Sequence, residues 1–121
     1  MKKLVILPVL LFITAIQPPP PLVVGDKLGW DQAAPTLVEA QAATYKYYLD
    51  SSATGIAFVN VTCSGTVSPF PCQVVTPIFS PGNHTIQLTA SNAAGESLKS
   101  SPFAFSFVVT LNSPSGIRII K

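Results

Sequence analysis

The sequence predicts an all-β protein, a single sandwich of about seven short antiparallel strands, and three observations lead to this prediction. Apolar and polar residues alternate over residues 84–91 and again over residues 103–109, which is the period of a strand with one buried face. Turn-forming residues separate the apolar segments at regular intervals, as at residues 80–83 and 92–95. With 121 residues, the chain is long enough for one domain and too short for two ordinary ones.

The N-terminus predicts an export signal. Lys2 and Lys3 precede a largely apolar run over residues 4–13. A basic start, a short apolar segment and then small residues are the pattern of a secretory signal peptide, and cleavage after Ala15 fits this pattern. The run is shorter than the roughly 20 apolar residues of a membrane span. We therefore predict a signal peptide over residues 1–15, a secreted chain and no stable membrane span in it; the alternative is a buried N-terminal strand or helix.

Four consecutive prolines follow at residues 18–21. A proline run is stiff and extended, and it cannot donate the hydrogen bonds of a sheet. We interpret residues 16–21 as a proline-rich linker that leads into an edge strand. The alternative is a ligand for a proline-binding groove.

The domain is expected to span residues 22–111, and its first strands are short. Residues 22–24 are apolar, and Leu28 and Trp30 then alternate with polar or small residues, as in a half-buried strand. Trp30 is the only tryptophan. We expect its ring to anchor the core between two sheets, with a surface binding role as the alternative.

Residues 36–43 carry contradictory signals. Thr36 followed by Glu39 fits a helix capping box, and the alanines favour a helix. The tyrosine-rich residues that come next strongly favour a strand. We predict a long loop with room for one helical turn.

The strand that follows, over residues 44–50, places Tyr45 and Tyr47 on one face and Tyr48 on the other. A hairpin-type turn then leads to a returning strand over residues 56–62. The remaining strands are expected over residues 73–79, 84–91 and 103–109.

The two cysteines, Cys63 and Cys72, are expected to form a disulfide. An even number of cysteines in an exported chain favours a bridge, and the turn formers between them allow the ends to meet. The alternative is a metal site, which needs more ligands than two thiols and one distant histidine supply.

Two aromatic residues are candidate exposed contacts, because aromatic side chains on a surface can anchor a partner. Tyr48 should face outward if its neighbours face inward. Phe70 lies between two prolines in the segment that joins the cysteines. The alternative for Phe70, which we favour, is that its ring caps the open end of the core.

The residues offer little for catalysis. His84 is the only histidine, the five acidic residues are dispersed, and Met1 is the only methionine. A catalytic triad, a paired-carboxylate site and a copper site each need more than this. We predict no catalytic, cofactor-binding or metal-binding residues. Without the two lysines of the signal, the formal net charge of +2 falls to near neutral, so the basic patch of a nucleic-acid binder is not expected.

Several short motifs carry a family resemblance: Trp30, Tyr45-Lys46-Tyr47, Pro81-Gly82 and Asn92-Ala93-Ala94-Gly95-Glu96-Ser97. In this order they resemble fibronectin type III and immunoglobulin-like modules over about residues 22–110. Such modules often carry a tyrosine at the corner before the sixth strand. His84 takes that place here, and the resemblance implies that its ring hydrogen-bonds nearby backbone. The cysteine pair is similar to that of immunoglobulin-like modules of secreted bacterial proteins.

The resemblance implies a fold that usually holds or binds. We therefore expect a secreted, non-catalytic module that makes protein or glycan contacts at a cell envelope or in an extracellular assembly, through loops or an unpaired edge strand. The alternative is a structural subunit or spacer, joined to others through the proline-rich linker and the C-terminal tail, residues 112–121. A third hypothesis, a small enzyme or metal protein, requires a functional His84.

Overall fold

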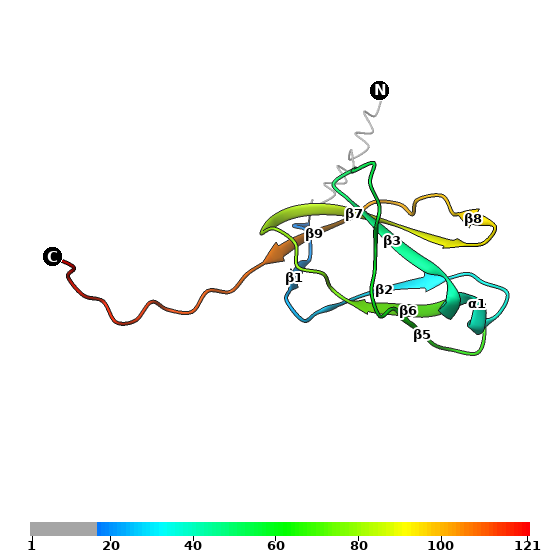
Figure 1. Cartoon of the computed structure of the whole chain (residues 1–121), viewed down its shortest axis with the longest axis horizontal. Coiled ribbons are helices and arrows are strands. Elements are labelled where there is room, and N and C mark those ends of the chain that lie inside the picture. Colours follow the sequence, from blue (N-terminus) through cyan, green and yellow to red (C-terminus); the bar gives the residue numbers. More distant parts are fainter. Residues whose placement is uncertain (1–16) are drawn as a thin grey trace, which may run out of the picture.

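The computed structural model describes residues 17–121, and the predicted signal peptide, residues 1–15, lies outside them. The described residues form an all-β fold with one short helix (Figure 1). The elements in chain order are β1 Pro21–Val23, β2 Lys27–Gln32, α1 Leu37–Ala42, β3 Thr44–Leu49, β4 Ile56–Ala57, β5 Thr62–Cys63, β6 Phe70–Val75, β7 Gly82–Asn92, β8 Gly95–Glu96 and β9 Phe103–Val108.

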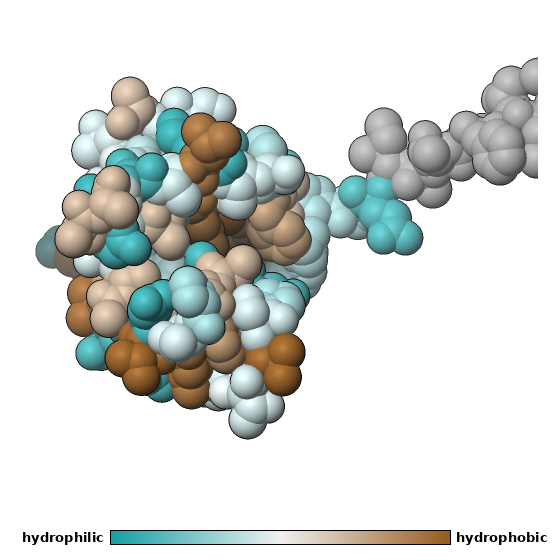
Figure 2. Space-filling model, turned by 90° about the vertical axis from the view of Figure 1, so that its right-hand side faces the viewer, coloured by the Kyte–Doolittle hydropathy of each residue, from teal (hydrophilic) through white to brown (hydrophobic). Residues whose placement is uncertain are grey.

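Two sheets of unequal width face each other. The wider sheet has the order β1-β9-β7-β3-β4, with β8 paired to the end of β7, and the narrower sheet has the order β2-β6-β5. Figure 1 shows β7, β9 and β3 in one layer and β2, β6 and β5 in the other. An end-on view shows a hollow with hydrophobic residues between the upper and lower parts of the molecule (Figure 2).

The prediction of purely antiparallel strands is wrong at one edge, where β1 and β9 run parallel. The chain does not return beside β1 in a hairpin. It turns at Gly25, whose φ of +94° suits glycine, and continues as β2 in the other sheet. Strand β1 is therefore free to pair with the last strand, which runs in the same direction.

The returning strand predicted over residues 56–62 is two strands in different sheets. The N–H of Phe58 still donates to the carbonyl of Tyr45 at 2.8 Å, so pairing beside β3 reaches that residue. Asn60 then adopts a φ of +62°, which breaks the extended backbone, and the chain crosses to the narrower sheet as β5. The next strand also differs from its prediction, because β6 begins at Phe70 and ends before Pro77.

The segment predicted as a long loop with room for one helical turn forms the helix α1, which has six residues. Thr36 is its N-cap: the N–H of Glu39 donates to the Thr36 hydroxyl at 3.2 Å. Ala40 is buried, and the hydroxyl of Tyr45 donates to its carbonyl at 2.6 Å. This contact with the core, added to the cap, explains why the helical signal prevails over the strand signal of the residues that follow.

Aromatic rings fill the space between the sheets. Tyr45 and Tyr47 face inward from β3, as their alternation predicted. The ring of Trp30 lies 5.1 Å from that of Tyr45 and 5.8 Å from that of Phe58, measured between centroids. Trp30 is partly buried against this cluster, so its ring does lie between the sheets.

Cys63 and Cys72 form the predicted disulfide. They lie directly opposite each other on β5 and β6, with Cα atoms 4.0 Å apart. The bridge therefore joins neighbouring strands of the narrower sheet and does not link the two sheets.

Candidate functional site

His84 joins two turns at one end of the wider sheet. Its Nδ1 donates to the Asp50 carboxylate at 2.7 Å, and its Nε2 donates to the Ser80 carbonyl at 2.6 Å. The Asp50 carboxylate also accepts the N–H of Thr85 at 2.9 Å. The bond from His84 to nearby backbone is the one that the resemblance implies. Asp50 as its second partner was not predicted, because 34 residues separate the two side chains.

Ser80, His84 and Asp50 bring together the three residue types of a hydrolase triad, but their geometry favours a structural role. In a triad, one imidazole nitrogen accepts the serine proton while the other donates to the aspartate. Here Nε2 is 3.3 Å from the Ser80 hydroxyl and only 2.6 Å from the Ser80 carbonyl, which can only accept. Nε2 therefore carries a proton and is not free to take one from Ser80.

The charges of this cluster support the same interpretation. The hydrogen bond to Asp50, and then the one to the Ser80 carbonyl, raise the pKa of His84 above 6.5. The hydrogen bond from His84 lowers the pKa of Asp50 below 3.8. A ring held as an imidazolium between an acceptor on each side is a clamp between two turns, and we call these three residues the His84 clamp.

Tyr48 is not an exposed contact, and the prediction is wrong for this residue. Its side chain does lie on the outer face of the wider sheet, yet it is buried. Its hydroxyl donates to the Glu96 carboxylate, and the ammonium of Lys99 lies 4.3 Å from the centre of its ring. The hydrogen bond to Glu96 raises the pKa of Tyr48. The side chains of Glu96, on β8, and of Lys99, beyond it, cover the ring, and strand alternation does not reveal such a cover.

Phe70 is not an exposed contact either. It is buried in the core cluster, opposite Gln32 on the neighbouring strand. The favoured alternative, a ring that caps the core, describes its position. Phe70 is the first residue of β6 and not part of the loop, so its side chain follows the inward alternation of that strand.

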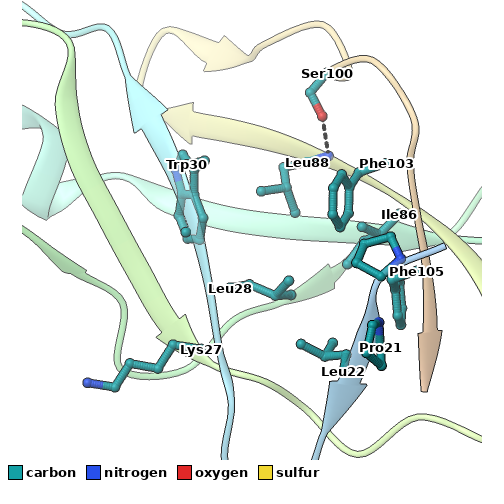
Figure 3. Close-up of a pocket in the computed structure, with 12 residues that line it drawn as sticks. Pro21, Leu22, Lys27, Leu28, Trp30, Ile86, Leu88, Ser100, Phe103 and Phe105 are labelled. Atoms are coloured by element: carbon teal, nitrogen blue, oxygen red, sulfur yellow. Dashed lines mark hydrogen bonds between the residues drawn. The ribbon is translucent and has the colours of Figure 1, made fainter. Parts of the chain in front are cut away.

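An apolar groove opens beside β2, because the narrower sheet does not cover the whole inner face of the wider one. The groove has a volume of about 350 Å³. Figure 3 shows that side chains from β1, β2, β7 and β9 surround it. The apolar residues that line it include Leu22, Leu28, Trp30, Ile86, Leu88, Phe103 and Phe105.

The exposure of Phe103 shows that the narrower sheet covers the inner face of the wider sheet only in part. It lies on the same face of β9 as Phe105 and Phe107, since side chains alternate along a strand. The exposed fraction of Phe105 is 1%, whereas that of Phe103 is 50%. An inward-facing phenylalanine that stays half exposed marks a place where a further strand or side chain can pack.

The edge of β2 that borders the groove is unpaired. No main-chain hydrogen bond joins β2 to any part of residues 17–121 other than β6 and the turns at its ends. In an antiparallel pair, the main-chain N–H and C=O groups of every second residue bond to the partner strand. The main-chain groups of the residues between them point to the opposite edge. The N–H of Thr76 donates to the Asp26 carbonyl, so even-numbered residues of β2 face β6. The N–H and C=O groups of Lys27, Gly29 and Asp31 therefore face the free edge.

The groove and the free edge together suit one kind of ligand. Unpaired backbone groups form the hydrogen bonds of an added strand, and apolar pockets receive its alternate side chains. The side chain of Asp31 points outward at this edge and has no hydrogen-bond or ionic partner among the described residues. The sequence did not reveal the groove, although Gly29 and Phe103 both line it.

Among the described residues, no group of three or more histidine, cysteine or acidic side chains is arranged to hold a metal ion. The helix of this part of the chain is also too short to cross a membrane. The chain matches no protein-family model, no curated protein and no solved structure.

Proposed function

We propose that this protein is a secreted, non-catalytic binding module with a fibronectin type III-like sandwich, and that it binds an extended segment of a partner protein along the free edge of β2. The observation that carries the proposal is Phe103, half exposed on an inner face beneath an unpaired strand edge. The two facing sheets and Trp30 between them support the family interpretation. The disulfide supports export, because such bonds persist in oxidising compartments.

The chemistry of the groove favours a peptide over a glycan. Its lining is mainly aliphatic and aromatic, and the hydroxyl of Ser100 already accepts the N–H of Leu88 at 2.9 Å. A sugar needs many convergent hydrogen-bonding groups, and few are present. A peptide strand obtains its hydrogen bonds from the backbone of β2 and buries apolar side chains below.

A displayed random-peptide library tests this function. We expect the selected peptides to alternate apolar and polar residues and to shift the amide NMR signals of Lys27, Gly29 and Asp31. Phe103→Arg should abolish their binding, because a guanidinium would be placed in the groove. Val67→Arg, at an exposed position outside the groove, is the matched control and should bind as the unmodified protein does. Failure to select any peptide, or equal binding by Phe103→Arg, would overturn the proposal.

The alternative of a structural subunit has support from the C-terminal tail. Its apolar side chains are almost fully exposed. Such exposure in an extended segment is typical of a part that packs against another molecule.

A further inference from the structure

We infer that the segment bound by the groove is the C-terminal tail of a second copy of this chain. Residues 117–120 of one copy would add to the narrower sheet of the next as a strand antiparallel to β2. This inference rests on the proposed function, because it assumes that the groove accepts an extended segment, and it names the partner.

The tail has the properties of a strand without a sheet. Ile117, Ile119 and Ile120 have exposed fractions between 84% and 95%. β-Branched residues of this kind favour strands, and the alternation places Ile117 and Ile119 on one face. In Figure 1 the tail extends away from the sandwich. These isoleucines therefore give up no buried contacts within their own domain when the segment binds elsewhere.

The spacing of the tail matches that of the groove. Residues directly opposite each other in an antiparallel pair share a face. With Ile119 opposite Leu28 and Ile117 opposite Trp30, both isoleucines enter the groove. Arg118 then lies opposite Gly29, where no side chain obstructs its stem.

The hydrogen bonds and charges fit this register. Gly29 and Lys27 direct their main-chain groups to the free edge, so the N–H and C=O groups of Arg118 and Ile120 face them. The guanidinium of Arg118 reaches diagonally toward Asp31, whose carboxylate is otherwise unpaired among residues 17–121.

A second copy fits better than the tail of the same chain. Strand β9 ends with Val108 opposite Val23, and only three residues separate Val23 from Lys27. A tail that folded back directly would therefore enter the groove at the Lys27 end and run parallel to β2, which gives a less stable pairing. A tail from another molecule has no such constraint. Because tail and groove are different surfaces, the contact is head-to-tail and produces chains or closed rings.

Sedimentation of the purified protein over a range of concentrations tests the inference. The wild-type chain should associate as concentration rises. Ile117→Asp with Ile119→Asp should weaken association on the order of tenfold or more, because two inward-facing side chains lose their burial. Ile120→Ser changes the outward face without adding a charge opposite Lys27, and it should associate like the wild type. Near-UV circular dichroism of the dilute monomers should be the same for all three, since Ile117, Ile119 and Ile120 are almost fully exposed in their own domain.

Three results would overturn the inference. One is a wild-type chain that stays monomeric throughout, and another is a double variant that associates like the wild type. The third is slow hydrogen exchange of the tail amides in a dilute monomer, which would show that the tail folds back on its own domain.

Synthetic peptides of residues 112–121 test the register on the double variant, whose groove is free. N-methylation at both Arg118 and Ile120 should abolish binding, because it removes the N–H groups that face β2. N-methylation at Ile117 and Ile119 should be tolerated, because those groups point away. Equal effects of the two modifications would contradict the proposed pairing.

The same variant separates the two proposals. If it binds peptides selected from the library but not the tail peptide, the groove function stands and the second-copy inference is wrong. If it binds neither, both are wrong.

Discussion

At the scale of single residues, His84 shows how one side chain links turns that are distant in the sequence. Its two ring nitrogens donate to Asp50 and to the Ser80 carbonyl, at 2.7 and 2.6 Å. Both bonds favour the charged ring. The clamp should therefore contribute to stability only where the imidazolium and the carboxylate coexist.

This charge state predicts a dependence of stability on pH. The pKa of His84 is raised in the folded state, so its contribution is present below about 6.5 and is lost as pH rises through the folded pKa. The pKa of Asp50 is lowered, so its contribution is present above 3.8 and is lost as pH falls through the folded pKa. We expect the free energy of unfolding in urea to be highest between these limits.

Replacement of His84 by Gln should remove the alkaline part of this dependence. We expect a loss of about 1–2 kcal/mol at pH 5, modest because Asp50 is half exposed and solvent weakens the pair. Urea titrations of both proteins at pH 5 and pH 9 provide the measurement. If the free energy of unfolding of the variant differs between the two pH values as much as that of the wild type, another group is responsible for the pH dependence.

At the scale of elements, α1 shows that a short helix depends on its ends and its contacts. Six residues are too few for a stable isolated helix, so the Thr36 cap and the buried Ala40 decide its formation. The capping pattern was visible in the sequence. Whether the helix would prevail over the strand-forming residues that follow was not visible in the sequence, because the hydroxyl of Tyr45 reaches Ala40 only in the folded molecule.

Thr36→Ala should therefore destabilise the protein by about 1 kcal/mol, because the N–H of Glu39 loses its acceptor. Thr36→Ser keeps the hydroxyl and is the control, with an expected change close to zero. The free energy of unfolding in guanidinium chloride measures both. Equal stability of the alanine and serine variants would show that the cap is not needed.

At the scale of the whole molecule, the difference in width between the sheets is the feature with the clearest consequence. Three strands face a sheet with five strands side by side, and the uncovered inner face lies beside the edge of β2. A closed sandwich would have buried Phe103 as fully as Phe105.

This difference predicts unequal costs for two similar substitutions on β9. Phe105→Ala removes a fully buried ring and should destabilise the isolated domain by about 3–5 kcal/mol. Phe103→Ala removes a ring that is half exposed, and we expect a loss of roughly half that value or less, because less apolar surface returns to water. Thermal and urea unfolding of dilute monomer provide the comparison. A comparable loss at both positions would mean that the groove is closed in solution.

The sequence by itself determined what depends on neighbouring residues. Alternation placed Tyr45 and Tyr47 inward, and turn formers separated the strands. The presence of two cysteines predicted the disulfide between Cys63 and Cys72. These features follow from the two-residue period of strands and from the number of cysteines, both of which can be read along the chain.

Only the tertiary structure decided which surfaces are covered. The cover of Tyr48 by Glu96 and the contact of Asp50 with His84 each join residues more than 25 positions apart. The position of Phe70 in the core depends on where β6 begins. The groove arises from the unequal numbers of strands in the two sheets. Burial is a property of how elements pack against one another, so a local pattern shows which face a residue points to but not what lies over it.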